Sequence, residues 1–163
     1  MSKKLEFQEI YYSNYPKVIR LCMGYLNGNE ALAKDLAQEV FIKVWQYIKD
    51  FRGEATISTW IYRITVNTCL QELRKQKTKP LKIDIAGNDT IEDPTTEKQF
   101  ASMYRCIDKL SAENKSIILL ELEGLPQKEI AEITGINHAA IRTRIHRIKD
   151  QLSKCVKNEY TPR

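Results

Sequence analysis

The sequence has no apolar run that approaches the roughly 20 residues of a membrane span, and no apolar signal-peptide core follows Met1. Glycine and proline are scarce, with 6 and 5 residues, and long β-branched runs are few. These absences argue against a membrane protein and against a β-rich fold. We therefore expect a nearly all-α protein that stays in the cytoplasm, without stable membrane insertion.

Cysteine is rare, and its spacing fits none of the common metal motifs. No CxxC pair is present, and neither His138 nor His146 lies at a zinc-ligand spacing from two cysteines. Free cysteines are usually buried. We therefore expect no metal site and four reduced, mostly buried thiols: Cys22, Cys69, Cys106 and Cys155.

The residues of an enzyme active site are also missing. The sequence shows no nucleophile paired with a base, no glycine-rich loop that would cradle a phosphate and no cluster of metal ligands. We predict no catalytic residues and no cofactor, so the sequence gives little support to an enzymatic function.

Positive charge is in excess and unevenly distributed. The formal net charge is +5 and the isoelectric point is near 9.0, which favours an acidic polymer as partner. Basic residues dominate residues 137–157, whereas residues 78–97 are mainly acidic. The chain thus combines basic lobes with an acidic middle.

Apolar residues at helical spacing predict three helices in the first part of the chain. The first has an apolar face that is interrupted or entered at Pro16, because proline disfavours a helix interior. The second follows Asn29, a suitable N-cap. A turn at residues 51–55 precedes the third helix, which restarts at Ser58 or Thr59. Three helices of this length can enclose a small core.

Helical periodicity disappears between residues 76 and 97, where proline and glycine punctuate a polar stretch. A connector of this length is typical of a tether between domains. We therefore predict a first domain at residues 1–77, an acidic flexible linker at 78–97 and a second domain at 98–163.

The second domain ends in a pattern typical of a helix-turn-helix. A short amphipathic helix at 127–133 runs into Thr134 and Gly135, and a longer helix starts at Asn137. Aliphatic residues form one stripe of the longer helix. Arg144 lies at the edge of this stripe and could equally contact DNA or form a structural ion pair. The opposite face, which a DNA major groove would receive, carries Arg142, Thr143, His146 and Arg147.

Together, these features resemble a small sigma factor of the extracytoplasmic-function (ECF) type, a promoter-specificity subunit of bacterial RNA polymerase in the sigma-70 family. Residues 35–45 resemble the family's polymerase-binding helix, and residues 51–67 resemble its promoter-melting segment. Residues 110–114, 124–133 and 141–147 resemble the domain that binds the upstream promoter element. The resemblance implies an all-α fold of two small helical domains, sigma-2-like and sigma-4-like, joined by a flexible linker.

The resemblance also implies a function and partners. The chain would bind the beta-prime clamp and beta flap of core RNA polymerase, recognise the −35 and −10 elements of promoter DNA and assist melting. An anti-sigma factor is the implied inhibitor. The alternative is a stand-alone helix-turn-helix regulator whose N-terminal lobe senses a ligand or dimerises; it would bind a palindromic site without polymerase.

The implied polymerase-binding residues are Asp35, Gln38 and Glu39. They share one helical face that points away from the apolar stripe. Without the resemblance, an ordinary solvated face is the simpler interpretation. We expect Phe41 and Trp45 to support this face from the core.

The resemblance places the downstream (−10) element against the turn and the start of the third helix. Aromatic side chains interleaved with polar groups suit single-stranded DNA, and Asn67 would read a base flipped out of the stack. The alternatives are that Trp60 is a core side chain, even within this family, and that Asn67 is an ordinary surface residue. The implied downstream contacts are Phe51, Arg52, Gly53, Trp60, Arg63 and Asn67.

The upstream (−35) element would meet the basic face of the last long helix. Arginine can bond guanine bidentately or hold a phosphate, and the sequence leaves both roles open for Arg142 and Arg147. Residues 137–140 depart from the commoner family pattern. The amino-acid sequence therefore does not define which DNA sequence is recognised.

Overall fold

The computed structural model describes residues 3–78 and 94–160. Within these residues every regular element is helical and no strand occurs, as the sequence predicted. The predicted linker falls largely on residues 79–93, which lie outside the described residues. The helices are α1 (Lys3–Tyr25), α2 (Glu30–Tyr47), the short 3-10 helix η1 (Ile48–Asp50), α3 (Ile57–Thr78), α4 (Pro94–Asp108), α5 (Ala112–Leu122), α6 (Gln127–Thr134) and α7 (His138–Tyr160).

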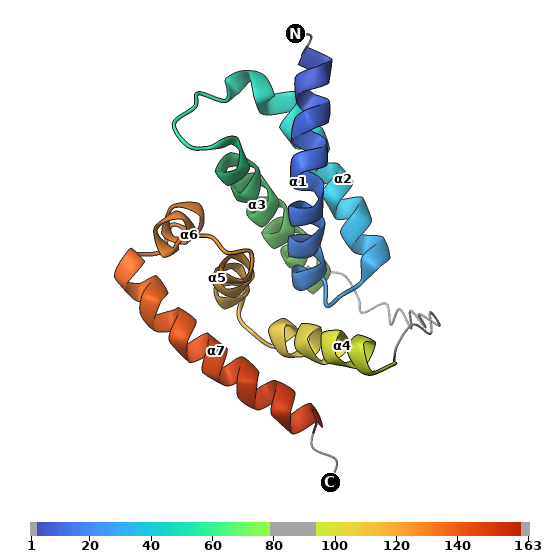
Figure 1. The fold of residues 1–163 in the computed structure, drawn as a ribbon, viewed down its shortest axis with the longest axis vertical. Coiled ribbons are helices and arrows are strands. Elements are labelled where there is room, and N and C mark those ends of the chain that lie inside the picture. Colours follow the sequence, from blue (N-terminus) through green and yellow to red (C-terminus); the bar gives the residue numbers. More distant parts are fainter. Residues whose placement is uncertain (1–2, 79–93, 161–163) are drawn as a thin grey trace.

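The helices α1, α2 and α3 pack against one another and form the N-lobe, residues 3–78 (Figure 1). As predicted, Asn29 caps α2: its side-chain oxygen accepts a hydrogen bond from the backbone N–H of Leu32 at 3.2 Å. The apolar stripe of α2, including Leu36, Val40 and Val44, is buried. The N-lobe core therefore follows the helical periodicity of the sequence.

Helix α1 runs unbroken through Pro16, where the sequence predicted an interruption or an entry point. That prediction is wrong because tertiary packing outweighs the local cost of a proline, which removes one backbone hydrogen bond. Val18 and Leu21, just after the proline, are fully buried in the core. The amide of Asn14 adds a hydrogen bond to the carbonyl oxygen of Ile10, at 2.8 Å.

The helices α4 to α7 form the C-lobe, residues 94–160, in which α4, α5 and α6 each contact α7. Ser111 caps the start of α5, since its hydroxyl accepts a hydrogen bond from the N–H of Asn114 at 3.2 Å. Gly135 ends α6 in a left-handed conformation, with φ at 76°. Asn137 caps the next helix, because its side chain accepts from the N–H of Ala139 at 2.9 Å. The predicted helix-turn-helix is therefore formed.

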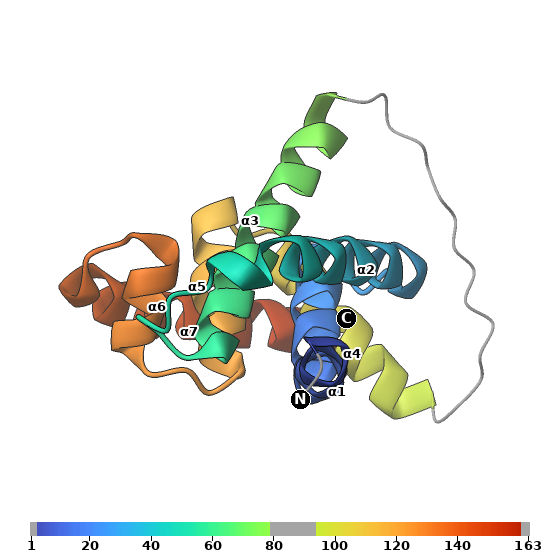
Figure 2. The ribbon, with the colours of Figure 1, turned by 90° about the horizontal axis from the view of Figure 1, so that it is seen from above.

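The two lobes touch, with α5 and α6 beside α3 and α1 (Figures 1 and 2). Gly24 of α1 allows a close approach, because a Cβ there would lie 2.2 Å from Cδ2 of Leu119 on α5. The hydroxyls of Tyr25 and Ser116 are 2.5 Å apart and hydrogen-bonded in the interior. The lobes therefore share a continuous apolar core.

An ion pair closes the edge of the lobe interface. Arg20 donates from Nε and Nη2 to the two carboxylate oxygens of Glu123, at 2.7 and 2.8 Å. Burial, together with the nearby negative charge of Glu123, raises the pKa of Tyr62 on α3 to about 12. The tyrosine hydroxyl therefore stays neutral at this contact between lobes.

Two of the four cysteines are not thiols, contrary to the sequence prediction. Cys106 on α4 and Cys155 on α7 form a disulfide. The other two, Cys22 and Cys69, are free and buried, with their sulfurs 3.8 Å apart. The prediction failed because only the packing of α4 on α7 brings together residues so distant in the sequence.

Candidate nucleic-acid and polymerase interfaces

The predicted polymerase-binding residues form an exposed face of α2. Asp35, Gln38 and Glu39 all reach solvent. Two exposed apolar side chains flank them on the same helix: Leu32 is 39% exposed and Ile42 54%. Positions 32, 35, 39 and 42 recur at alternating spacings of three and four, the pattern with which a helix meets another helix. Sequence analysis missed these two apolar residues, because apolar positions in a helix are assigned to the core by default.

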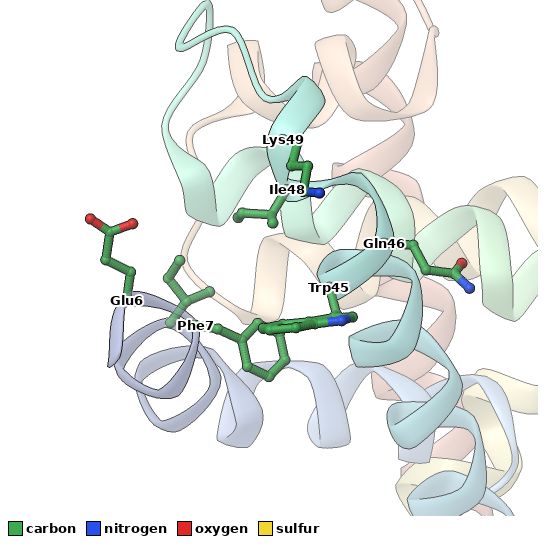
Figure 3. A pocket seen from close by; sticks show the side chains of 7 residues that line it. Glu6, Phe7, Trp45, Gln46, Ile48 and Lys49 are labelled. Atoms are coloured by element: carbon green, nitrogen blue, oxygen red, sulfur yellow. The ribbon is translucent and has the colours of Figure 1, made fainter. Parts of the chain in front are cut away.

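Trp45 is not a core residue. The prediction holds for Phe41, which is buried, but the side chain of Trp45 is 48% exposed. Trp45 lies near the end of α2 and meets the edge of Phe7 on α1, with ring centroids 4.9 Å apart (Figure 3). Together with Ile48 and neighbouring residues, these rings line a hollow of about 590 Å³. Phe7, near the start of α1, covers part of the indole, and the rest of the ring stays accessible.

The residues predicted to meet the downstream element lie in the loop before α3 and on α3 itself. Phe51 and Trp60 pack ring to ring, with centroids 5.4 Å apart, and both are partly buried. Gly53 adopts a φ of 73° with no atom within 4 Å of the position of a Cβ, so the loop is open to solvent there. Arg52 of the same loop is exposed.

The polar residues of this predicted site project from α3. Arg63 and Asn67 are one helical turn apart and exposed, and neither makes a hydrogen bond or ion pair with another described residue. The start of α3 is fixed by Thr56, whose hydroxyl accepts from the N–H of Thr59 at 3.2 Å. A rigid helix therefore presents two unengaged polar groups beside an aromatic pair.

The predicted upstream-element residues share the solvent face of α7. Their four side chains, Arg142, Thr143, His146 and Arg147, are all exposed. Three of them, excluding Arg147, line a hollow of about 520 Å³ between α7, the end of α5 and the start of α6. The buried stripe predicted for this helix is confirmed at Ile141, Ile145, Ile148 and Leu152.

Arg144 and Lys149 of α7 form ion pairs with acidic residues of α5. Arg144 donates to Glu113 at 2.8 Å, which settles its open assignment in favour of a structural ion pair. Lys149 donates to Glu121 at 3.1 Å. Arg142 and Arg147, by contrast, have no carboxylate partner among the described residues. The guanidinium groups of these two arginines are therefore available to an anionic partner.

Comparisons with known proteins match both lobes in order. The family model for sigma-70 region 2 matches residues 10–79, and that for sigma-70 region 4 matches residues 100–152. An ECF RNA polymerase sigma-E factor from Haemophilus influenzae is 34% identical over 152 residues, covering 83% of this chain and 79% of the relative. The chain belongs to the sigma-70 family.

Other relatives agree with this assignment. The RNA polymerase sigma factor SigV of Bacillus subtilis is 35% identical over 133 residues, covering 78% of this chain and 77% of SigV. The sigma factor RpoE of Bartonella quintana, solved in complex with the anti-sigma factor NepR, superposes with a TM-score of 0.71 at 20% identity, covering 93% of this chain and 97% of RpoE. CnrH, solved with the cytosolic domain of CnrY, gives 0.74 at 18% identity, covering 96% and 91%. These two structures share the fold of this sigma factor across both lobes.

The sigma factor directs promoter-specific transcription initiation with RNA polymerase. Region 2 contains the exposed face of α2 and the loop and helix with the downstream residues, whereas region 4 contains the helix-turn-helix. The presence of both regions supports this function over a stand-alone regulator. Within the part of the chain that the structure describes, no helix has the length and apolar character needed to cross a membrane.

Proposed function

We propose that the sigma factor docks on the polymerase clamp through the face of α2 that contains Asp35, Gln38 and Glu39. The observation that carries this proposal is the stripe of acidic and amide groups bordered by the exposed Leu32 and Ile42. Exposed apolar residues rimmed by polar ones mark protein interaction surfaces. The apolar pair supplies buried area on docking, and the acidic groups select a basic partner surface.

The loop before α3 and the exposed side of α3 bind the −10 element. The rings of Phe51 and Trp60 offer a surface for an unstacked base, and Arg52 and Arg63 hold the backbone phosphates. Asn67 reads the edge of a base flipped from the non-template strand. Unstacking costs a few kcal/mol, which the contacts in this site offset.

The face of α7 enters the major groove of the −35 element. Arg142 and Arg147 carry this role because neither is committed to an ion pair within the described residues, and Thr143 and His146 complete the surface. A bidentate arginine-guanine contact discriminates by about 1 to 3 kcal/mol. Arg144 instead holds α7 against α5.

In the structure the two lobes are in contact, an arrangement that we call closed. The lobes have to separate before the −35 and −10 elements can both be bound. Two elements about 25 base pairs apart are separated by about 85 Å of DNA, at about 34 Å per helical turn. A compact chain of this length has a radius of gyration of only about 15 Å. The polymerase therefore separates the lobes, and it supplies the fixed spacing that neither lobe has alone.

An anti-sigma factor stabilises the closed arrangement. This step is supported by RpoE, which was solved in complex with the anti-sigma factor NepR and resembles this chain over both lobes. CnrH, which resembles the chain over a similar extent, was likewise solved with a bound partner, the cytosolic domain of CnrY. The sigma factor itself performs no chemistry, needs no cofactor and acts in the cytoplasm. Its role is to position and open promoter DNA for the polymerase.

In vitro transcription with purified core polymerase tests this proposal. The factor should direct initiation from a promoter that carries both elements, and core polymerase alone should not. A failure to associate with core polymerase would overturn the proposed docking on the clamp. Association without promoter selection would overturn the assignments on α3 and α7.

A further inference from the structure

The disulfide between α4 and α7 lies at the surface of the C-lobe, beside charged groups. Cys106 is only 2% exposed, whereas Cys155 is partly accessible. The ammonium of Lys109 lies 3.9 Å from the sulfur of Cys155. A carboxylate oxygen of Glu159 lies within 4.8 Å of both sulfurs. The sulfur of Cys155 is therefore accessible to small reagents and lies beside the positive charge of Lys109.

Glu159 is held in place by its own partners, which reduces its repulsion of a thiolate. Its carboxylate accepts from the hydroxyl of Ser102 at 2.5 Å and from the guanidinium of Arg105 at 3.0 Å. These two hydrogen bonds lower the pKa of Glu159. The negative charge of the Glu159 carboxylate is therefore balanced by the guanidinium of Arg105 on α4.

The second cysteine pair provides a contrast within the same chain. Cys22 and Cys69 are completely buried between α1 and α3, with their sulfurs 3.8 Å apart. Burial raises the pKa of the Cys69 thiol, which keeps it protonated and unreactive. The surface pair and the buried pair should therefore differ in their response to oxidants.

We propose that Cys106 and Cys155 form a reversible thiol-disulfide site that responds to peroxide and staples α4 to α7. The proposal rests on the proposed cytoplasmic location, where low-molecular-weight thiols keep the resting pair reduced. The thiolate of Cys155 attacks the peroxide, forming a sulfenic acid and releasing water. The thiol of Cys106 then displaces a second water, so two thiols and one hydrogen peroxide give one disulfide and two waters. Two molecules of a small thiol reverse the step and leave as their own disulfide.

The staple acts on an apolar groove of the C-lobe. The groove, about 620 Å³, lies between α4, α5 and α7, and its walls include Met103, Ile118, Leu152 and Val156. Cys106 follows Met103 by one turn of α4, and Cys155 follows Leu152 by one turn of α7. Oxidation therefore fixes the separation of the two walls, and reduction lets them move.

The test uses the purified full chain, reduced with glutathione and then treated with hydrogen peroxide. Differential alkylation and mass spectrometry should find a disulfide between Cys106 and Cys155, while Cys22 and Cys69 remain thiols. Hydrogen exchange in residues 153–160 should slow at least tenfold on oxidation. The thermal midpoint should rise by about 10 °C, as expected for closing a loop of about 50 residues. Glutathione should reverse all three changes.

Three variants keep the proposal falsifiable. Cys155→Ser alters a partly exposed position and should abolish the disulfide and both shifts, whereas the matched Cys22→Ser variant should retain them. Lys109→Gln should slow oxidation several-fold without preventing it. A pair that stays reduced in peroxide, or that glutathione cannot reduce, would overturn the proposal. Zinc retained by the reduced wild-type chain but not by Cys155→Ser, without a peroxide-driven disulfide, would show a metal site instead.

Discussion

Placing a methyl group at Gly24 should push the two lobes apart. In the closed arrangement, a Cβ there would lie 2.2 and 2.9 Å from the two terminal carbons of Leu119. Such overpacking costs about 1 to 3 kcal/mol. Within α1 itself, alanine is the better helix former by up to about 1 kcal/mol, so the N-lobe should keep its structure. The cost of Gly24→Ala therefore falls on the contact between the lobes.

The expected consequence is a larger population of open chains and tighter binding to core polymerase. A cost of about 2 kcal/mol shifts the closed-to-open equilibrium by a factor of about 30. The apparent affinity for core polymerase should rise by up to that factor, and it saturates once the open form dominates. Small-angle scattering of the free chain should show a larger radius of gyration, and fluorescence anisotropy should show the gain in affinity.

A double-mutant cycle supplies the control for this experiment. Leu119→Ala in the Gly24→Ala background restores space at the contact, so it should recover part of the compact population relative to Gly24→Ala alone. Unchanged compactness and unchanged polymerase affinity in Gly24→Ala would refute the reasoning. The same radius with altered circular dichroism would show that α1, and not the interface, had absorbed the strain.

Three further predictions concern the proposed contacts. Asn67→Ala should reduce open-complex formation about tenfold while core-polymerase binding stays intact, as followed by permanganate footprinting; a loss of polymerase binding would place its role elsewhere. Arg147→Ala should cost about 1 to 3 kcal/mol in transcription from promoters that need the −35 element, whereas Arg144→Ala should cost under about 1 kcal/mol, because it breaks only an exposed ion pair. Equal losses in both variants would argue against a base contact. Reversing the charges of Asp35 and Glu39 should weaken co-purification with core polymerase at least tenfold, and wild-type recovery would contradict the docking face.

Helical periodicity predicted much of the fold because each lobe is built from amphipathic helices with recognisable ends. Asn29, Ser111 and Gly135 act at helix ends through local chemistry, so their roles follow from neighbouring residues. The path of α1 through Pro16 was not predictable in this way, since it depends on packing against elements far along the chain. The pairing of Cys106 with Cys155 has the same origin.

In the proposed sites, too, features set within one helix were predictable and contacts between helices were not. The solvent face of α7 follows from the position of each residue in the helix, and exposure of Arg142 and Arg147 was predictable. The commitment of Arg144 to Glu113 was not, because that partner lies on another helix. The exposure of Trp45 also depends on how far α1 extends over α2. Contacts between elements, including the whole interface between the lobes, therefore required the structure.

Binding to a promoter duplex that carries both elements, with and without core polymerase, tests the central claim most directly. At physiological salt, the purified chain alone should show no preference for that duplex over one with both elements scrambled. The complex with core polymerase should prefer it by at least a hundredfold. Tight and selective binding by the chain alone would contradict the claim that the polymerase must separate and position the two lobes.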